Sequence, residues 1–577
     1  MGSNKRHIEH ILLIALVGII VGITAIPYFE KGLSGHIGDL MYHLQRIEAV
    51  KDALESNEYP VGVYARFLYG YGYGSPLFYP DLFLVYPALL RVFGVSVIST
   101  WKIFALTITT LASLSTYFSL KYICKKSEAA IAGTFLLMLS QFYLADLINR
   151  VGISEYLAYI FLPMLFAGIY DFFEYEGKKT WLFGVAFWGM LFSHAIMTFL
   201  GVMFTSAVFL IAFFIPKWRV VYHDVQRIKR LVVTAIFTVL VSAGYIFPML
   251  EQMKSGKFFY QEPWICVSEA VQDVETLFLL KGYFDITAYV GVGFPILVVL
   301  MLFGRDMLLV KKTGLSGGIF LYIGLGMFLC TTKIFPWHLL DKTIFNMIQM
   351  PYRLYPYALC ALVMGIVLHI SEKYYNNNMK RISFFIIFLS VSFGILQNKN
   401  YEILELTKGI DEKFLDENTG YAIGMGEWLP LDVDLENLSS GKLPQTVVIE
   451  SSGEEEVFLN SPNEFCYKFQ AVSLEEEIYQ IPLIYYKGYC ATISSETSDT
   501  CGLELLRTET DLIEVRKPAG YQGIIEIWYE GTVLQKVSKI ITWCTIFLLL
   551  VMTGFVKYKE EITGFIAYVC DLQNMGE

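Results

Sequence analysis

Charged residues are scarce in this sequence. Asp, Glu, Lys and Arg make up 17% of the 577 residues, whereas hydrophobic residues make up 55% and aromatic residues 16%. Soluble globular domains carry roughly 25% charged residues, so this composition excludes an ordinary soluble protein. The predicted fold class is a polytopic α-helical membrane protein with about 12 transmembrane helices.

Cysteine and the short catalytic motifs are also sparse. The nine cysteines are scattered, and none makes a CxxC or Cys/His spacing of the kind that binds zinc. The sequence contains no GxxxxGKS/T phosphate loop, no GxSxG nucleophile elbow and no HExxH pair. No residue is therefore predicted as a metal ligand and no cofactor is assigned, a divalent metal stays an open alternative, and no nucleic-acid partner is predicted.

Long apolar runs recur along most of the chain. About 20 apolar residues cross a bilayer, and we predict spans at residues 8–27, 99–120, 129–147, 156–174, 180–195, 197–215, 231–250, 287–304, 315–331, 354–371, 380–397 and 537–557. The first run is long and no small-residue cleavage site follows it, so we interpret it as a retained anchor rather than a signal peptide.

The distribution of Lys and Arg predicts the orientation. With the N-terminus inside, every internal loop is basic, as the positive-inside rule expects. Residues 76–97 are apolar enough to span but would invert every later loop, so we interpret them as a re-entrant or surface-lying part of the first external loop. The prediction is a multi-pass protein of the bacterial plasma membrane with both termini cytoplasmic, and with residues 28–98 and 400–536 extracytoplasmic.

The acidity of the protein is concentrated in residues 400–536. This region holds 26 acidic and nine basic residues, and its short alternating runs predict a small β-sandwich. The predicted domains are a transmembrane domain at 1–399 with a large first external loop at 28–98, the extracytoplasmic domain at 400–536, and a last helix with a cytoplasmic tail at 537–577. Cys490 and Cys501 are candidates for a disulfide in an oxidising compartment, with Cys466 left over.

A polar face on the first external segment is the strongest candidate for catalysis. In a helix, Asp39, His43 and Arg46 lie at i, i+4 and i+7 and share one face, while Leu40 and Leu44 begin a separate apolar stripe. Asp39 and His43 are the candidate catalytic residues, and Arg46 is a candidate substrate ligand. The alternative is an amphipathic interfacial helix whose polar face is only in contact with water.

Four more polar residues belong to the same membrane face in the predicted topology. They are Arg150 and Glu155 between the third and fourth spans, His194 at the end of the fifth, and Arg353 before the tenth. Individually, Arg150 and Glu155 could pair to fix a turn, Arg353 could reach the headgroups and His194 could be a satisfied interfacial histidine. Because all four occur at one depth, we predict that they bind substrate in one shared cavity.

A carboxylate and several arginines in an outer cavity suit a polyprenyl-phosphate sugar. Arginine neutralises the phosphate, which is also the leaving group, and a carboxylate can deprotonate the acceptor hydroxyl. The glycine-tyrosine run at 69–74 lacks the strand-to-helix context of a nucleotide loop and is interpreted as a loop that could face substrate.

Several of these motifs also resemble known families. Gly38-Asp39 with His43 and Arg46, the run 74–80, Arg150 with 155–158, Leu162-Pro163, His194 and 350–353 resemble the bacterial membrane family labelled 6-pyruvoyl-tetrahydropterin-synthase-related. Residues 481–489, 518–520 and 527–529 resemble the outer β-domain of YfhO-like membrane proteins. Both families are similar to the GT-C glycosyltransferases, and this resemblance implies an acidic base in the first external loop and a lipid-phosphate sugar donor. It implies that Asp39 is the base, although Asp39 has no Asp-x-Asp partner.

The predicted function is an inverting membrane glycosyltransferase that moves a sugar from a polyprenyl-phosphate donor to an envelope glycan or lipid acceptor, with membrane lipid as a further partner. Two alternatives remain at this stage. A lipid-linked glycan transporter or flippase would need ionisable residues deep in several spans, and these are sparse. A non-catalytic envelope scaffold would need no base, so the effect of removing Asp39 distinguishes both from an enzyme.

Overall fold

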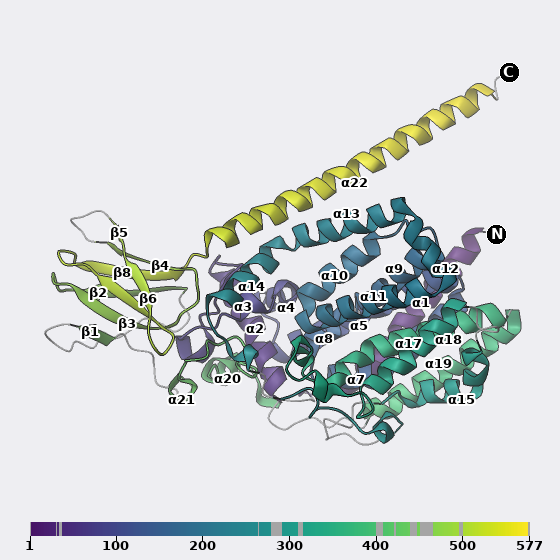
Figure 1. Ribbon diagram of the computed structural model, residues 1–577, viewed down its shortest axis with the longest axis horizontal. Coiled ribbons are helices and arrows are strands. Elements are labelled where there is room, and N and C mark those ends of the chain that lie inside the picture. Colours follow the sequence, from purple (N-terminus) through teal and green to yellow (C-terminus); the bar gives the residue numbers. More distant parts are fainter. Residues whose placement is uncertain are drawn as a thin grey trace.

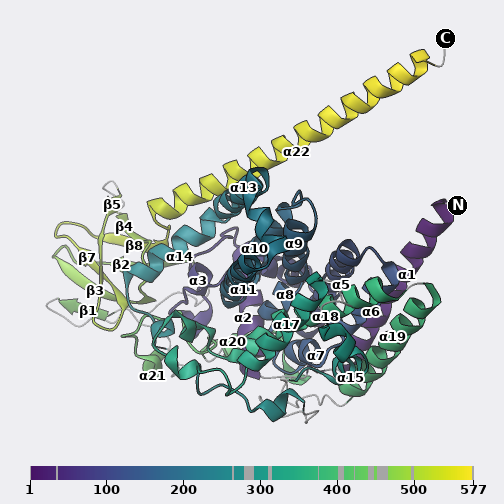
Figure 2. The same ribbon diagram turned by 45° about the vertical axis from the view of Figure 1, so that its right-hand side comes forward.

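The chain folds into a helical body with two β-sheets at one end (Figure 1). The computed structural model describes residues 2–30, 32–33, 37–262, 265–278, 291–309, 315–374, 376–399, 408–420, 423–438, 447–450, 465–494 and 500–574. The start of the predicted span at 287–304, the basic residues Lys311 and Lys312, and part of the predicted outer domain lie outside these ranges. Both chain ends lie at the end of the body opposite the sheets (Figures 1 and 2).

Seven helices in the described residues are long and apolar enough to cross a membrane. They comprise α1 (Gly2–Thr24), α5 (Val97–Cys124), the continuous pair α8 (Ile153–Ala158) and α9 (Leu162–Glu174), α11 (Ala195–Phe214), α18 (Tyr355–Lys373), α19 (Asn376–Lys399) and α22 (Val533–Asn574). Two bent pairs raise the count to nine: α6 (Ser127–Met138) with α7 (Gln141–Ile148) at 47°, and α13 (Val225–Val241) with α14 (Ala243–Ser255) at 68°. The helical part is that of a multi-pass membrane protein.

The predicted count of 12 spans is not confirmed. At the fifth, eighth and ninth predicted spans the structure has α10 (Trp181–Ser193), α15 (Phe294–Leu308) and α17 (Leu315–Cys330), of 13, 15 and 16 residues. Each is shorter than the roughly 20 residues that a helix needs to cross the hydrocarbon core. Hydropathy alone cannot separate such short buried helices from spans, because both are apolar.

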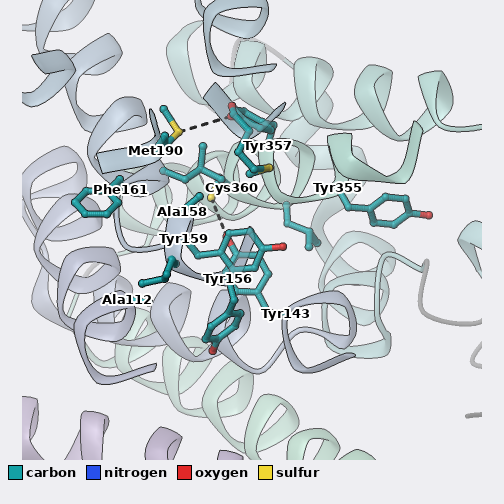
Figure 3. Packing of buried hydrophobic residues seen from close by; sticks show 14 of the residues in the cluster. Ala112, Tyr143, Tyr156, Ala158, Tyr159, Phe161, Met190, Tyr355, Tyr357 and Cys360 are labelled. Atoms are coloured by element: carbon teal, nitrogen blue, oxygen red, sulfur yellow. Dashed lines mark hydrogen bonds between the residues drawn. The ribbon is translucent and has the colours of Figure 1, made fainter. Parts of the chain in front are cut away.

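The centre of the helical body is packed around α18, which is almost entirely buried. Small residues allow close helix approach there: a Cβ at Gly365 would lie 2.5 Å from Leu321, and one at Gly324 would lie 2.8 Å from Leu362. Tyrosines fill the adjoining space, as Figure 3 shows. The rings of Tyr143 and Tyr159 stack at 4.2 Å. This packing gives the site described below a rigid base.

The first external segment is built from short helices. They are α2 (Ile37–Glu55), α3 (Ser75–Phe78) and α4 (Val85–Val92), with 3-10 turns η1 (Ile26–Phe29), η2 (Phe67–Gly70) and η3 (Leu82–Leu84). The longest helical stretch in residues 76–96 is therefore Leu82–Val92, formed by η3 and α4 together, which is too short to span. Arg91 pairs with Glu48, which is 1% exposed, and so fixes α4 against α2.

The remaining short elements connect the longer helices. They are α12 (Pro216–Arg219), α20 (Glu412–Glu417) and α21 (Leu435–Leu438), with 3-10 turns η4 (Val220–His223), η5 (Phe259–Gln261), η6 (Val274–Leu277), η8 (Trp337–Leu339), η9 (Ile344–Ile348) and η10 (Pro351–Leu354). Arg66 ties α20 to the first external segment, because its guanidinium pairs with Asp52 and with Asp416, both at 2.7 Å.

Eight strands form two four-stranded antiparallel sheets before α22. The strands are β1 (Val447–Glu450), β2 (Cys466–Ala471), β3 (Glu477–Ile484), β4 (Tyr489–Ser494), β5 (Cys501–Gly502), β6 (Glu504–Arg507), β7 (Leu512–Lys517) and β8 (Gly523–Tyr529). Their orders are β1-β3-β7-β6 and β2-β8-β4-β5. Inward residues of both sheets, among them Ile481 and Ile527, share one apolar cluster, as the alternating sequence pattern predicts.

The register of the sheets separates the two cysteines considered for a disulfide. Cys501 of β5 lies opposite Ile493, three residues along β4 from Cys490. At about 3.4 Å per residue this offset is roughly 10 Å, more than a disulfide can bridge. Both thiols are reduced, and the Cys490 Sγ donates to Glu530 Oε2 at 3.0 Å.

The segment 423–430 joins the sheets to the external loops. The Tyr486 hydroxyl donates to the Trp428 carbonyl at 3.0 Å, and the Trp428 N–H donates to the Tyr73 hydroxyl at 3.3 Å. The Trp428 ring stacks on Phe78 at 5.3 Å. Trp428 thus bridges the sheets and the first external segment, which are also joined directly by the hydrogen bond from the Ile484 N–H to the Tyr71 carbonyl at 2.9 Å.

Candidate functional site

The polar face of α2 is covered by protein rather than by water. Asp39, in the first turn, is exposed, but His43 and Arg46 are only 6% and 1% exposed. Leu40 and Leu44 on the other face are buried as well. The structure therefore disagrees with the interfacial-helix alternative, because α2 is enclosed on both faces from its second turn onward.

Arg46 holds the turn that follows α3. Its Nη2 donates to the Pro80 carbonyl at 2.7 Å and to the Tyr79 carbonyl at 3.3 Å, and its guanidinium carbon lies 4.3 Å from the Tyr79 ring centre. Its Nε is buried without a hydrogen-bond partner among the described residues. Arg46 thus organises the site wall and retains one donor.

His43 lies beside Arg46 in an apolar setting, with the Trp101 ring 6.5 Å away. Burial lowers the pKa of His43 well below its ordinary value of 6.5, and the charges of Arg46 and His194 lower it further. Its Nδ1 is buried with no partner in the described part of the chain. The ring is therefore neutral at physiological pH. A neutral ring can accept a proton directly.

We expect His43 to reduce stability in acid. Below about pH 6.5 the unfolded chain binds a proton that the folded protein does not, so the free energy of unfolding falls as the pH falls, by at most about 1.4 kcal/mol per pH unit. His43→Gln should lose less stability than the wild type between pH 7 and pH 5.5 in a denaturant titration in micelles. The exposed His338, changed to Gln, is the control and should leave the pH dependence unchanged. A His43→Gln slope equal to the wild-type slope would contradict a neutral, buried ring.

His194 links α10 to α11. Its backbone is extended, and its Nδ1 accepts from the Met197 N–H at 3.2 Å, which caps α11. Its ring meets the Tyr79 ring edge at 5.9 Å. His194 and Arg46 therefore both contact Tyr79, and the cap explains the position of His194 without requiring a ligand.

Arg150 is held between two carboxylates. Its guanidinium pairs with Asp146, which is fully buried, and with Glu155 Oε2 at 3.1 Å. The Tyr159 hydroxyl donates to Asp146 at 2.7 Å. The Arg150 guanidinium also lies 4.7 Å from the Tyr352 ring centre. This buried triad fits the view that Arg150 and Glu155 fix a helix turn.

The turn between Asp146 and Glu155 needs special backbone geometry. Val151 has a positive φ of 57°, and a Cβ at Gly152 would lie 2.8 Å from Asp146 Oδ1. Glycine at 152 is therefore required for the carboxylate of Asp146 to approach the chain. Asp146 was not among the predicted site residues, although its i,i+4 spacing to Arg150 was a signal in the sequence.

Arg353, like Arg46, has an unused donor. Its Nη1 donates to the Ile348 carbonyl at 3.0 Å and to Gln349 Oε1 at 2.7 Å, while its Nε is buried without a partner in the described residues. It acts electrostatically on Glu155 and on Glu427. Arg353 therefore joins the Arg150 triad to the start of α2.

Glu427 is a further carboxylate that sequence reasoning missed. Its Oε2 accepts from the Met425 N–H at 3.2 Å, and burial raises its pKa. The nearby Asp39 carboxylate adds to that increase and Arg353 opposes it. Arg150 and Glu155 are paired directly, and Arg46 and His194 both contact Tyr79, whereas Asp39, Glu427 and Arg353 are related only through their charges. Among the described residues no group of three or more His, Cys, Asp or Glu could hold a metal ion.

Fold and site together define a multi-pass helical membrane protein with a polar cluster where its helices meet the two sheets. The chain belongs to the family of unknown function DUF6541, whose model matches residues 8–364. That match ends before the residues that resemble YfhO-like proteins, and both resemblances drawn from the motifs stay predictions. No curated protein matches the sequence.

Several solved structures match part of the chain, and two of them are described here. One is the arabinofuranosyltransferase AftD from Mycobacteria, with a TM-score of 0.42 and 13% identity over 67% of this chain and 26% of that chain. The other is the oligosaccharyltransferase of Archaeoglobus fulgidus, in a complex with Zn and sulfate, with a TM-score of 0.38 and 14% identity over 68% of this chain and 53% of that chain. This chain therefore spans about a quarter of the first protein and about half of the second.

Proposed function

We propose that the protein is a GT-C-like membrane glycosyltransferase, which moves a sugar from a polyprenyl-phosphate donor to an extracytoplasmic envelope glycan or lipid. The observation that carries the proposal is a group of charged side chains from distant parts of the chain: the charges of Asp39 and Arg353 both act on Glu427, and Arg353 also acts on Glu155, which pairs with Arg150. In this proposal the exposed Asp39 carboxylate is the base, and Arg353, whose Nε is an unused donor, is the phosphate ligand.

The proposed reaction inverts the anomeric centre. Asp39 takes the proton of the acceptor hydroxyl, the acceptor oxygen forms a bond to the anomeric carbon, and the bond from that carbon to the phosphate oxygen breaks. The lipid phosphate leaves with the electron pair, and Arg353 stabilises its charge. Arg46 and His194 position the wall at Tyr79, His43 stays neutral, and the triad of Arg150, Asp146 and Glu155 supports Arg353.

The proposal is tested by comparing a deletion strain with its complemented parent. Mass spectrometry of envelope glycans and of lipid extracts should show one glycan lost or shortened in the deletion strain, together with accumulation of a polyprenyl-phosphate sugar. Complementation should reverse both changes. Unchanged glycans and unchanged lipid-linked sugars in the deletion strain would overturn the transferase assignment.

Arg353 should require its guanidinium and not only its charge. Lysine keeps the charge but lacks the planar fork that bonds two phosphate oxygens, so Arg353→Lys should weaken donor binding by about tenfold or more. Binding of a polyprenyl-phosphate sugar to the purified protein measures this. Arg381→Lys, at the other end of α19 from the site, is the matched control and should bind like the wild type. Equal donor affinity of Arg353→Lys and wild type would show that Arg353 is only an interfacial anchor.

The orientation belongs to the same proposal. We propose that both termini are cytoplasmic, that residues 28–98 and 400–536 are extracytoplasmic, and that 400–536 forms a β-sandwich domain between the transmembrane domain at 1–399 and the last helix and tail at 537–577. In a variant without native cysteines, an impermeant maleimide should label a cysteine at position 475 in intact cells and leave one at 222 unlabelled. Labelling of position 222 would contradict this orientation, because residues 28–98 with Asp39 would then lie on the cytoplasmic side.

A further inference from the structure

A cavity of about 1150 Å³ lies next to the polar cluster and is not part of it. Its walls come from the first external segment, α4, the bend between α13 and α14, the underside of the two sheets and the first turns of α22. Most of the lining side chains are apolar or aromatic, among them Leu77, Tyr245, Leu483 and Trp543. A cavity of this size and character suits a hydrophobic ligand rather than a sugar.

The cavity extends along a spanning helix. Gln535, Lys539 and Trp543 line it, and α22 begins at Val533. At 1.5 Å per residue, Trp543 lies about 15 Å along the helix from that start, which is roughly half the thickness of a hydrocarbon core. The cavity therefore runs from the underside of the sheets into the depth of one membrane leaflet.

The cavity is bordered by apolar side chains that are not covered by protein. Leu82, Tyr86 and Leu89 of η3 and α4 are about 40% exposed, and Trp543 of α22 is 69% exposed. Only 11% of the residues in the most apolar stretch of α22 are buried. In a membrane these side chains face lipid, so the space between α4 and α22 connects the cavity with the bilayer.

One cation lies on the cavity wall without a bonded partner. Lys539 forms no hydrogen bond or ion pair with the described residues, and its one electrostatic neighbour is Asp81. The Asp81 carboxylate already accepts from the Tyr59 hydroxyl at 3.2 Å and the Tyr64 hydroxyl at 3.0 Å. An ammonium group on a spanning helix is costly unless an anion or the interface accompanies it.

The turn at 79–81 separates the cavity from the polar cluster. Pro80 and Asp81 line the cavity, while the Pro80 carbonyl accepts from Arg46 and the Tyr79 ring contacts Arg46 and His194. A ligand head group near Asp81 and Lys539 would thus lie one turn of the backbone away from the cluster.

We propose that this cavity binds a membrane lipid with a phosphate head group, which enters between α4 and α22, lays its chain along the apolar walls and places its phosphate at Lys539. The site is separate from the proposed donor phosphate ligand Arg353, and its occupancy does not depend on transferase activity. Phospholipids and polyprenyl phosphates share the required chemistry.

Native mass spectrometry of the delipidated full-length protein tests the site. The probes are phosphatidylglycerol, a polyprenyl phosphate, and the uncharged diacylglycerol and polyprenol. Lys539→Gln should weaken retention of the phosphate lipids by about fivefold and leave the uncharged lipids unchanged. Lys536→Gln is the control, because Lys536 lies one turn earlier on α22 and is not part of the lining, although its ion-pair partner Glu530 is; it should match the wild type.

A second pair of variants tests the entrance. Leu89→Trp narrows it and should lower retention of all four probes, whereas Val92→Trp, exposed on the same helix and outside the lining, should not. If the wild type retains phosphatidylglycerol and polyprenyl phosphate unequally, the lipid that is retained more strongly is the one that the site prefers. The proposal is overturned if Lys539→Gln retains phosphate lipids like the wild type, if the wild type retains uncharged lipids equally well, or if Leu89→Trp has no effect. None of these measurements uses sugar transfer, so loss of the proposed function leaves them unaffected.

Discussion

Replacement of Asp39 by Asn should reduce sugar transfer by about 100-fold or more while the protein remains folded. The change removes a base but almost no volume, and proton transfer by a positioned carboxylate contributes a factor of roughly 100 to 10,000. Because Asp39 is exposed, its replacement should leave the packing of α2 intact. Transfer from a polyprenyl-phosphate sugar to extracted envelope acceptor, measured in nanodiscs, gives the rate.

The matched control is Asp432→Asn. Asp432 is an exposed carboxylate a few residues after Glu427, so the substitution makes the same chemical change outside the cluster. Its transfer rate should equal that of the wild type, and both variants should elute as the wild type does in size-exclusion chromatography. Near-wild-type transfer by a folded Asp39→Asn protein would end the assignment of Asp39 as base.

Loss of the Arg150 side chain should be the most destabilising change in the cluster. Arg150→Ala would leave Asp146 and Glu155, which are 0% and 2% exposed, without their cation. Removing one partner from a buried ion pair costs about 3–5 kcal/mol. The free energy of unfolding in mixed micelles should fall by this amount.

Two comparisons make that result specific. Lys178→Ala breaks an ion pair with Glu176 whose side chains are both 72% exposed, so it should cost at most about 1 kcal/mol. The triple change of Arg150→Met, Asp146→Asn and Glu155→Gln removes the charges together and should recover much of the loss. If Arg150→Ala costs no more than Lys178→Ala, the triad does not hold the turn at 151–152.

The face of α2 and the turn residues could be predicted because their signals are local. Helical spacing alone places Asp39, His43 and Arg46 on one face. The helix that this requires is present as α2. Whether that face would be wet or enclosed could not be predicted, since Tyr79 and Trp101, which cover it, come from elsewhere in the chain. The same spacing fits both outcomes.

Asp146 and Glu427 were missed for different reasons. Asp146 lies in an apolar run that is interpreted as a membrane span, and this interpretation does not predict its pairing with Arg150. Glu427 is one of 26 acidic residues in 400–536, and nothing local distinguishes it from the others. Only the long-range docking of segment 423–430 brings it to Asp39 and Arg353.

The span count shows a similar limit. Two predicted spans are bent, by 47° and 68°, and three are helices of 13 to 16 residues. Hydropathy measures how unfavourable it is to expose a segment to water. A short helix that packs against protein and a long helix that faces lipid are equally apolar, so hydropathy does not distinguish them.

Trp428 gives the two sheets a mechanical role. It bonds to Tyr486 on the sheet side and to Tyr73 on the loop side, and it is the residue next to Glu427. Any movement of the two sheets relative to the first external segment would therefore strain the backbone at Trp428 and, with it, the adjoining residue Glu427. The direct hydrogen bond from the Ile484 N–H to the Tyr71 carbonyl opposes the same movement.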